Sequence, residues 1–405
     1  MNFPALSILG VLAFIVALLF SVMVHEAGHF LTAKKFQMRV TEFFLGFGKR
    51  LWSFQRGETE FGIKAIPAGG YCRISGMSVN EELPESEKHR AFYLASVPKR
   101  LIVLGAGSFL HFVLGFLILV LLLAGVGVTI VTNTIGEVVP CVLNTSSGVT
   151  DTKCSATSNP SPAKIAGLKV NDQITAINGT EYENWLDYTT KIRASAHKEI
   201  NLTVLRNGKK FSIPITPAAR TLDGKEIGYL GVINKLGTRK EGSFKAIANS
   251  ARLTKDLLNN SVTSLISLPT KIPALVRQTF GSEKRDAQGL VGVVGVARVS
   301  AQTASDPKLK SREKVASFLI IIASLNIFVG VFNLLPLLPL DGGHMAVAIV
   351  DGVRRINARR RKKTAPAPID VERLLPLTLA VFAVLAVLSL LLLAADIFNP
   401  INLNQ

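Results

Sequence analysis

The residues best suited to do chemistry lie in one short stretch, His25-Glu26-Ala27-Gly28-His29. On an α-helix, residues four apart share a face, so the two imidazoles could chelate one Zn²⁺ with Glu26 beside it as a general base. A pattern with three fixed positions also arises by chance. The alternative interpretation is a helix end whose His and Glu side chains simply reach interfacial water.

A catalytic zinc takes three protein ligands and leaves one position open. The other apolar stretches of the chain offer two strong candidates for the third ligand, His111 and Asp341. Asp341 follows Pro336 and Pro339, which must break the helix before it. Broken backbone at membrane depth is tolerated only where it is buried in protein or lines a wet cavity. The sequence therefore favours Asp341 over His111, although a helix-end acid near the interface is an alternative for Asp341.

These residues lie within or beside four uncharged runs, at 5–24, 101–131, 315–340 and 374–395. A spanning helix needs about 20 apolar residues, so each run predicts a transmembrane helix rather than a core helix of a soluble protein. The first run has no basic residues before it and no small-residue cleavage site after it, so we expect a retained span and not a signal peptide. A hydrophobic content of 48% and only 3 Cys exclude a disordered chain and a disulfide-dense miniprotein.

Basic residues set the expected orientation. Lys and Arg number 46 against 28 Asp and Glu, and basic clusters lie in the loops at 35–100 and 341–373. The segment 132–314 is also basic, but long domains translocate largely regardless of charge. The positive-inside rule then places both loops in the cytoplasm and both termini, with the segment 132–314, outside. The basic tract at 354–363 could instead bind nucleic acid, but between two spans we expect it to set topology and to contact anionic lipid.

Three soluble segments have recognisable patterns. Short alternating strands punctuated by glycine predict a hairpin or small sheet within 35–100. A compact α/β module is expected at 160–235, with a tight turn at Asn207-Gly208, and an amphipathic helix at 244–268 could lie on the bilayer surface. Cys141 and Cys154 both fall in the external segment, where we expect a disulfide; two free thiols are the alternative.

The motifs together resemble the site-2 protease family of zinc intramembrane proteases. The resemblance rests on the His25-Glu26-x-x-His29 motif paired with Asn333-x-x-Pro336 and Leu340-Asp341-Gly342. It is closest to the bacterial four-span branch with external PDZ domains, and a single PDZ domain is similar to actinobacterial members. Segments 46–48 and 67–71 match the family's membrane-facing β-loop, 162–179 its PDZ core, and 291–297 a segment before the third span.

The resemblance implies a polytopic α-helical membrane protein with four transmembrane helices, a membrane-associated β-loop and an extracytoplasmic PDZ-like α/β domain. It implies a multi-pass protein of the bacterial plasma membrane. The expected divisions are 1–34 (first span), 35–100 (β-loop), 101–131 (second span), 132–240 (PDZ domain), 241–314 (juxtamembrane segment), 315–345 (third span), 346–373 (basic loop) and 374–396 (fourth span).

The implied reaction is hydrolysis of a peptide bond inside the transmembrane helix of a single-span substrate, after a first external cut. One Zn²⁺ would be held by His25, His29 and Asp341. Glu26 would move the proton, and Asn333 would hold substrate backbone or the developing oxyanion. The implied substrate-binding residues are Gly46, Phe47, Gly48, Gly69, Gly70 and Pro336. The implied partners are anti-sigma factors or remnant signal peptides and the lipid bilayer, without nucleic acid.

Two other classes of function compete with a protease. A metal transporter could use His25, His29 and Asp341 as a transit site, but such proteins usually distribute ligands along a path and need no glutamate beside the first one. A non-catalytic scaffold presenting a PDZ module would not need a complete ligand set. The sequence leaves open whether that module excludes bulky substrates or docks shortened ones.

Overall fold

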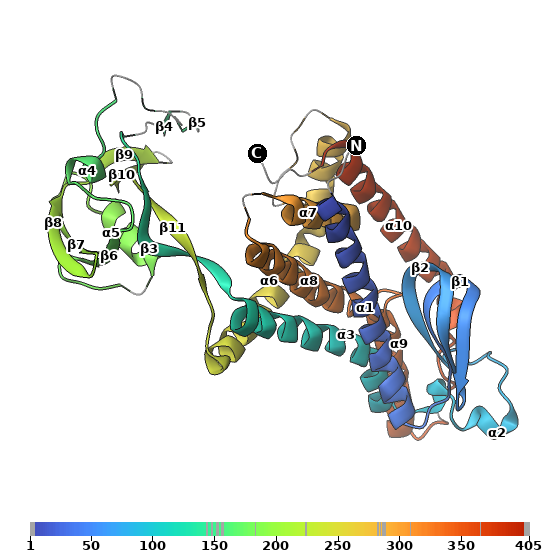
Figure 1. Cartoon of the computed structure of the whole chain (residues 1–405). Helices are drawn as coiled ribbons and strands as arrows, with labels where there is room; N and C mark the ends of the chain where they lie inside the picture. Colours follow the sequence, from blue (N-terminus) through green and yellow to red (C-terminus); the bar gives the residue numbers. More distant parts are fainter. Residues whose placement is uncertain are drawn as a thin grey trace. The chain divides into compact units, whose positions relative to one another are not determined.

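The computed structural model describes residues 5–142, 145–146, 149–150, 154, 158–182, 184–222, 225–281, 283, 285, 289–307, 309–364 and 366–400. The chain divides into two compact units (Figure 1). Unit 1 comprises Met1–Val126 and Glu241–Gln405, and unit 2 comprises Gly127–Lys240.

Among the described residues of unit 1, four helical segments are long and apolar enough to cross a membrane. They are α1 (Ala5–Lys35), α3 (Val97–Val120) continued by the π-helical turn η2 (Leu121–Val126), α8 (Ser311–Asn333), and η3 (Val371–Leu374) continued by α10 (Leu375–Phe398). Each of the four predicted runs lies largely within one of these segments. The second run ends differently from the prediction, because 128–131 belong to a strand of unit 2.

Small residues let α1 approach its neighbours closely. A Cβ on Gly28 would lie 2.6 Å from the carbonyl oxygen of Ala106 in α3, and one on Gly10 would lie 3.1 Å from the Cα of Ala301 in α7 (Val293–Ser305). Helices that associate in lipid gain mainly from such close packing, since apolar side chains are as well solvated by lipid as by protein. The motif-bearing helix is therefore held firmly between its neighbours.

A long antiparallel hairpin follows α1 and consists of β1 (Val40–Arg56) and β2 (Thr59–Ile74). Gly46 and Gly48 have φ angles of +89° and +83°, which L side chains rarely adopt, and the register shifts around them. The hairpin packs against α1 (Figure 1). Its base shares a small core with α1 and α3 that includes Ala33, Val40, Ile74 and Val103. The short α2 (Glu85–Lys88) and η1 (Phe92–Leu94) lead into α3.

The third span ends at Asn333, and α9 (Asp341–Arg360) begins after a connector of seven residues, 334–340. The two prolines expected to break the helix lie in this connector. The basic segment 346–373, expected to connect the third and fourth spans, is helical as far as Arg360, where α9 ends. Apart from Gly352, the segment 344–360 contains no helix breaker and is rich in Ala and Arg, which are good helix formers.

The segment between unit 2 and the third span is also helical. Helix α6 (Ser243–Phe280) extends well beyond the predicted 244–268 and runs through Pro269 and Pro273.

Asp396, near the end of α10, accepts hydrogen bonds from the backbone N–H of Gly295 (2.7 Å) and from Arg285 (3.2 Å). The Arg285 and Asp396 side chains are both buried, and their ion pair ties the end of α10 to the segment before α7. The hydrogen bond from Gly295 ties it to α7 itself.

Unit 2 is built on a five-stranded sheet in the order β11-β3-β6-β7-β8. The bounds are β3 (Val128–Val138), β6 (Gln173–Ile177), β7 (Ile200–Arg206), β8 (Lys209–Ile215) and β11 (Val232–Arg239). Helices α4 (Pro162–Ile165) and α5 (Trp185–Arg193), the pair β9 (Ala218–Leu222) and β10 (Lys225–Tyr229), and the short β4 (Thr145–Ser146) and β5 (Val149–Thr150) complete it.

The core of unit 2 forms between the sheet and α5, where Ile174, Leu202, Val204 and Tyr188 are fully or almost fully buried. At the β7–β8 turn, Asn207 and Gly208 both have positive φ, as a tight hairpin turn of this kind requires. The predicted disulfide between Cys141 and Cys154 is present.

Candidate metal centre

Three potential metal ligands from two helices converge in unit 1. His25 and His29 lie one turn apart on α1, and Asp341 is the first residue of α9. The Nε2 atoms of the two histidines are 3.1 Å apart, and Oδ2 of Asp341 lies 3.2 Å from the first and 3.4 Å from the second. A tetrahedral ion with ligands at about 2.0–2.1 Å separates its donor atoms by about 3.3 Å. The three atoms therefore fit the ligand triangle of one zinc ion.

The surroundings orient both imidazoles. Nδ1 of His29 lies 2.8 Å from the carbonyl oxygen of Val103 in α3, which can only accept, so Nδ1 carries the proton and Nε2 keeps its lone pair. Both histidines are buried. Gly107 of α3 lies against both rings, because a Cβ there would come within 2.5 Å of His25 and 2.6 Å of His29. Only glycine leaves room at this position for both rings.

Glu26 lies on α1, on the side of the helix that faces the hairpin. Its side chain is half-buried. A Cβ on Gly70 would lie 3.2 Å from Cγ of Glu26 and 3.1 Å from the sulfur of Met23. The strand thus lies directly against the side chain of Glu26.

His111, the other candidate ligand, is placed beside the centre but outside it. Its ring lies 4.9 Å from that of His25, while its Nδ1 lies 2.9 Å from Oδ1 of Asn326 in α8 and 3.3 Å from the hydroxyl of Ser21. Among the described residues, the group whose donor atoms could share an ion consists of His25, His29 and Asp341. His111 instead joins a buried polar cluster that cross-links three helices next to the ligands.

Sequence reasoning missed Ser21, Asn326 and Gly107. A usable signal existed for the first two. Ser21 precedes His25 by four residues and so shares its helix face, and Asn326 is a polar residue in the middle of an uncharged run. Gly107 has no comparable signal, since its importance comes from α3 packing on the imidazoles.

The remaining predicted site residues are distributed over two places. Gly46, Phe47, Gly48 and Gly69 lie on the hairpin, where the ring of Phe47 stacks on Tyr71 with centroids 5.9 Å apart. Asn333 ends α8 and is half-buried, and Pro336 is exposed in the connector to α9. Within the described part of the chain, no hydrogen bond joins Asn333 to the ligand triangle.

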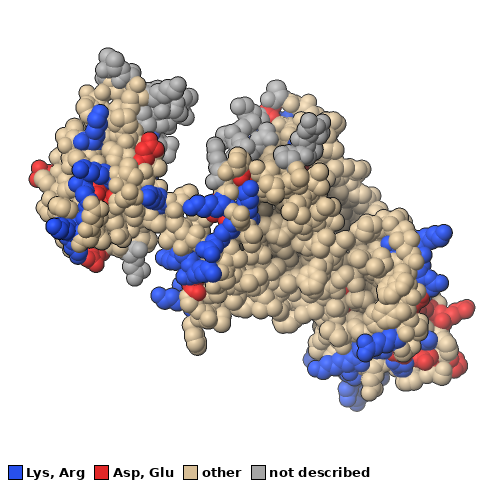
Figure 2. Space-filling view, viewed as in Figure 1, with Lys and Arg blue, Asp and Glu red and all other residues tan. Residues whose placement is uncertain are grey.

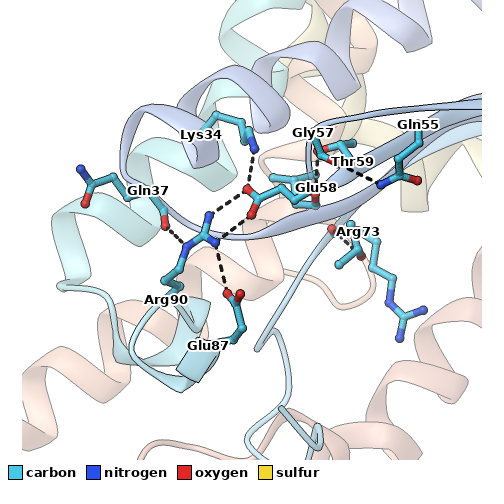
Figure 3. Close-up of polar contacts among 11 residues, drawn as sticks. Lys34, Gln37, Gln55, Gly57, Glu58, Thr59, Arg73, Glu87 and Arg90 are labelled. Atoms are coloured by element: carbon cyan, nitrogen blue, oxygen red, sulfur yellow. Dashed lines mark hydrogen bonds and ion pairs between the residues drawn. The ribbon is translucent and has the colours of Figure 1, made fainter. Parts of the chain in front are cut away.

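An ion-pair cluster fixes the far end of the hairpin to the end of the ligand helix (Figure 3). Glu58, beside the hairpin turn, accepts from Lys34 of α1 at 2.5 Å and from both terminal nitrogens of Arg90 at 2.7 and 2.8 Å. Arg90 also donates to the carbonyl oxygen of Gln37 and to Glu87. The hydrogen bonds from Arg90 and Lys34 lower the pKa of Glu58 to about 2, so its carboxylate stays ionised at neutral pH.

Comparison with known proteins places this geometry in a family. The sequence matches peptidase family M50 over residues 13–375. It is 34% identical over 414 residues to zinc metalloprotease Rip1 of Mycobacterium tuberculosis, an alignment that covers 98% of this chain and 99% of the relative. It is 25% identical to zinc metalloprotease RasP of Geobacillus kaustophilus, covering 87% and 92% of the two chains. It is also 25% identical to regulator of sigma-E protease RseP of Salmonella typhimurium, covering 84% and 90%.

These matches confirm the expected relationship and the expected class of enzyme. The relatives are zinc metalloproteases, and the four apolar helices agree with a multi-pass membrane protein. The chain therefore belongs to peptidase family M50, the site-2 protease family of membrane zinc metalloproteases.

Proposed function

We infer that this protein is a zinc-dependent intramembrane endopeptidase that cuts the transmembrane helix of a single-span substrate. The observation that carries the inference is the ligand triangle formed by His25, His29 and Asp341, with Glu26 beside it on an apolar helix long enough to span a bilayer. Ionisable groups placed in such a helix cost free energy on insertion and are usually functional.

His25, His29 and Asp341 would hold one zinc ion. When bound, zinc in a three-ligand site supplies Lewis-acid polarisation of a carbonyl and lowers the pKa of water toward about 7. Glu26 accepts a proton from the attacking water and passes it to the leaving amine. The close approach of Gly70 in β2 limits where the Glu26 side chain can lie. Asn333, at the end of α8, holds substrate backbone or the developing oxyanion.

The substrate must be unwound before it is cut, because a helix hides its own carbonyl groups in hydrogen bonds. The hairpin is suited to receive the unwound strand by edge pairing. Gly70 brings the backbone of β2 to Glu26, and Gly46, Gly48 and Gly69 allow close approach of another backbone. Phe47, with 44% of its surface exposed, offers an apolar contact. Pro336 contributes from the exposed connector.

Unit 2 is proposed to be a PDZ-like module outside the membrane, together with both termini, in a bacterial plasma membrane. Its role in this proposal is a size filter that admits substrates already shortened outside, such as anti-sigma factors or remnant signal peptides. Replacing 133–235 by a flexible bridge should then permit cleavage of full-length substrates. Loss of cleavage of shortened substrates in a folded, zinc-loaded variant would instead indicate docking.

The deciding experiment compares Glu26→Gln with the unchanged protein on a reconstituted single-span substrate. Cleavage should fall by at least 100-fold, while zinc content and thermal stability stay unchanged, because the amide keeps the shape of the side chain but cannot accept the proton. Glu82→Gln, at an exposed position in the segment before α2, is the matched control and should cleave normally. If Glu26→Gln remained active, the protease assignment would be wrong, and zinc flux through the protein would point to a transporter.

A further inference from the structure

The rotation of α9 about its axis is set by a buried ion pair. Asp351 is fully buried and accepts from Arg100 of α3 at 2.8 Å and from Arg355 of its own helix at 3.2 Å. On the same face, Gly352 packs against Val97, which its Cβ would meet at 2.9 Å. One face of α9 is therefore fixed on α3, and the opposite face is turned outward.

The exposed face of α9 is apolar in its middle part and basic at its end. Ile349, Val353 and Ile356 are each about half exposed, and their spacing of four and three residues places them in one stripe. Five exposed basic residues begin one turn further on, and we call them the basic end of α9. They are Arg359 and Arg360, which end the helix, and Arg361, Lys362 and Lys363, which follow it. From residue 352 to residue 369 the sequence contains no acidic residue to neutralise them.

Charge in unit 1 follows the same division. Figure 2 shows a broad surface of unit 1 that carries almost no charged side chains, with charged side chains gathered at its two ends. The four apolar helices expose large hydrophobic residues, such as Phe20 of α1 and Val387 of α10. The basic end of α9 follows the exposed apolar stripe of the same helix, so we expect it at the edge of the surface that contacts hydrocarbon.

We propose that the basic end of α9 is a binding surface for the headgroups of anionic phospholipids, an inference that rests on the proposed membrane function. The apolar stripe spans about 10 Å of helix at 1.5 Å per residue, enough to reach from the hydrocarbon to the headgroup layer. The basic residues begin one turn beyond it, at the depth of the phosphates. Each Lys or Arg near an anionic membrane surface raises affinity by about fivefold.

Continuity between stripe and charge favours a membrane over nucleic acid. A nucleic-acid surface requires basic and polar groups but gains nothing from an exposed row of Ile and Val directly beside them. An amphipathic helix that lies at a bilayer interface needs both features on one face. The occupant consistent with α9 is therefore lipid with negatively charged headgroups.

The experiment uses full-length protein in phosphatidylcholine bilayers that contain a small fraction of a photoreactive lipid, either phosphatidylglycerol or phosphatidylcholine. After irradiation, mass spectrometry measures the cross-linked lipid on the segment 346–363. The ratio of phosphatidylglycerol to phosphatidylcholine there should be well above one. It should fall at least fivefold in the variant Arg359→Gln/Arg360→Gln/Arg361→Gln, and also at high salt, because exposed charges are screened.

The control variant removes three exposed lysines of unit 2, by Lys191→Gln/Lys198→Gln/Lys209→Gln, and should leave the ratio unchanged. Because no substrate is involved, Glu26→Gln should also keep the full ratio, so the result is independent of the protease assignment. A ratio near one in the unchanged protein would overturn the proposal. So would a ratio that survives the arginine substitutions, or tight RNA binding by the basic end without lipid enrichment.

Discussion

Gly107→Ala tests the metal centre with the smallest possible perturbation. The added methyl group would lie 2.5 Å from Cε1 and 2.6 Å from Nδ1 of His25, and 2.6 Å from Nε2 of His29. Ordinary contact begins near 3.4 Å, so each ring would have to move by about 0.8–0.9 Å. His29 cannot retreat freely, because its Nδ1 is hydrogen-bonded to Val103 on the same helix as the new methyl group.

Such a movement is large for a metal site, whose ligand distances hold to within about 0.2 Å. Substitutions that merely disturb the groups supporting a ligand already cost about 10–100-fold in metal affinity. We therefore expect Gly107→Ala, which displaces two ligands directly, to weaken zinc binding by at least 100-fold. General helix destabilisation cannot be the cause, since alanine is favoured over glycine inside a helix by about 0.5–1 kcal/mol.

The assay equilibrates purified full-length protein with buffers of fixed free zinc and measures bound metal by mass spectrometry, with circular dichroism to verify folding. Gly105→Ala is the matched control on the same helix. Its methyl group would find its nearest neighbour, Cε of Met345, at 3.8 Å and should leave zinc affinity unchanged. If Gly107→Ala bound zinc as tightly as Gly105→Ala, the packing of α3 on the two imidazoles, and the ligand assignment based on it, would be refuted.

Three other expectations follow from the same structure. Asp341→Ala should lose zinc in this equilibration whereas His111→Ala should retain most of it, and the reverse result would make His111 the third ligand. For Glu58, the folded-state pKa of about 2 lies below the ordinary value of 4.5, so its stabilisation is complete above pH 4.5 and is lost as the pH falls toward 2. Hydrogen exchange of the hairpin should accelerate over that range, and Glu58→Gln should abolish this pH dependence; an unchanged profile would contradict the role of the ion pairs. Reporter enzymes active only outside the cell should work when fused near residue 220 and stay silent near residue 360, and the opposite pattern would reverse the proposed orientation.

Local features of the chain were readable from its residues. The four spans follow from uninterrupted apolar length, because a bilayer demands about 20 such residues whatever the neighbours are. The shared face of His25 and His29 follows from helix periodicity, and the break before Asp341 from its prolines. The Asn207-Gly208 turn likewise needs only local backbone preferences. The disulfide was expected from the location of its two cysteines, and the family followed from two distant motifs.

Other features depend on contacts between distant segments, which no local pattern encodes. The rotation of α9 about its axis is one such feature, because Asp351 pairs with Arg100, 251 residues away. The same applies to α6, whose helix persists through two prolines because its neighbours in unit 1 pack against it.

The candidate site also has features set by one segment and features set by contacts between segments. The sequence alone determined which residue types could bind zinc and move a proton, since motif spacing and helix geometry are properties of one segment. Only the tertiary structure decided that Asp341 reaches the two histidines while His111 turns to Asn326 and Ser21. Only it brought β2 onto Glu26 and Gly107 onto both imidazoles. Interatomic distances of about 3 Å between remote segments arise from the packing of all the helices together, and this packing has no local signature.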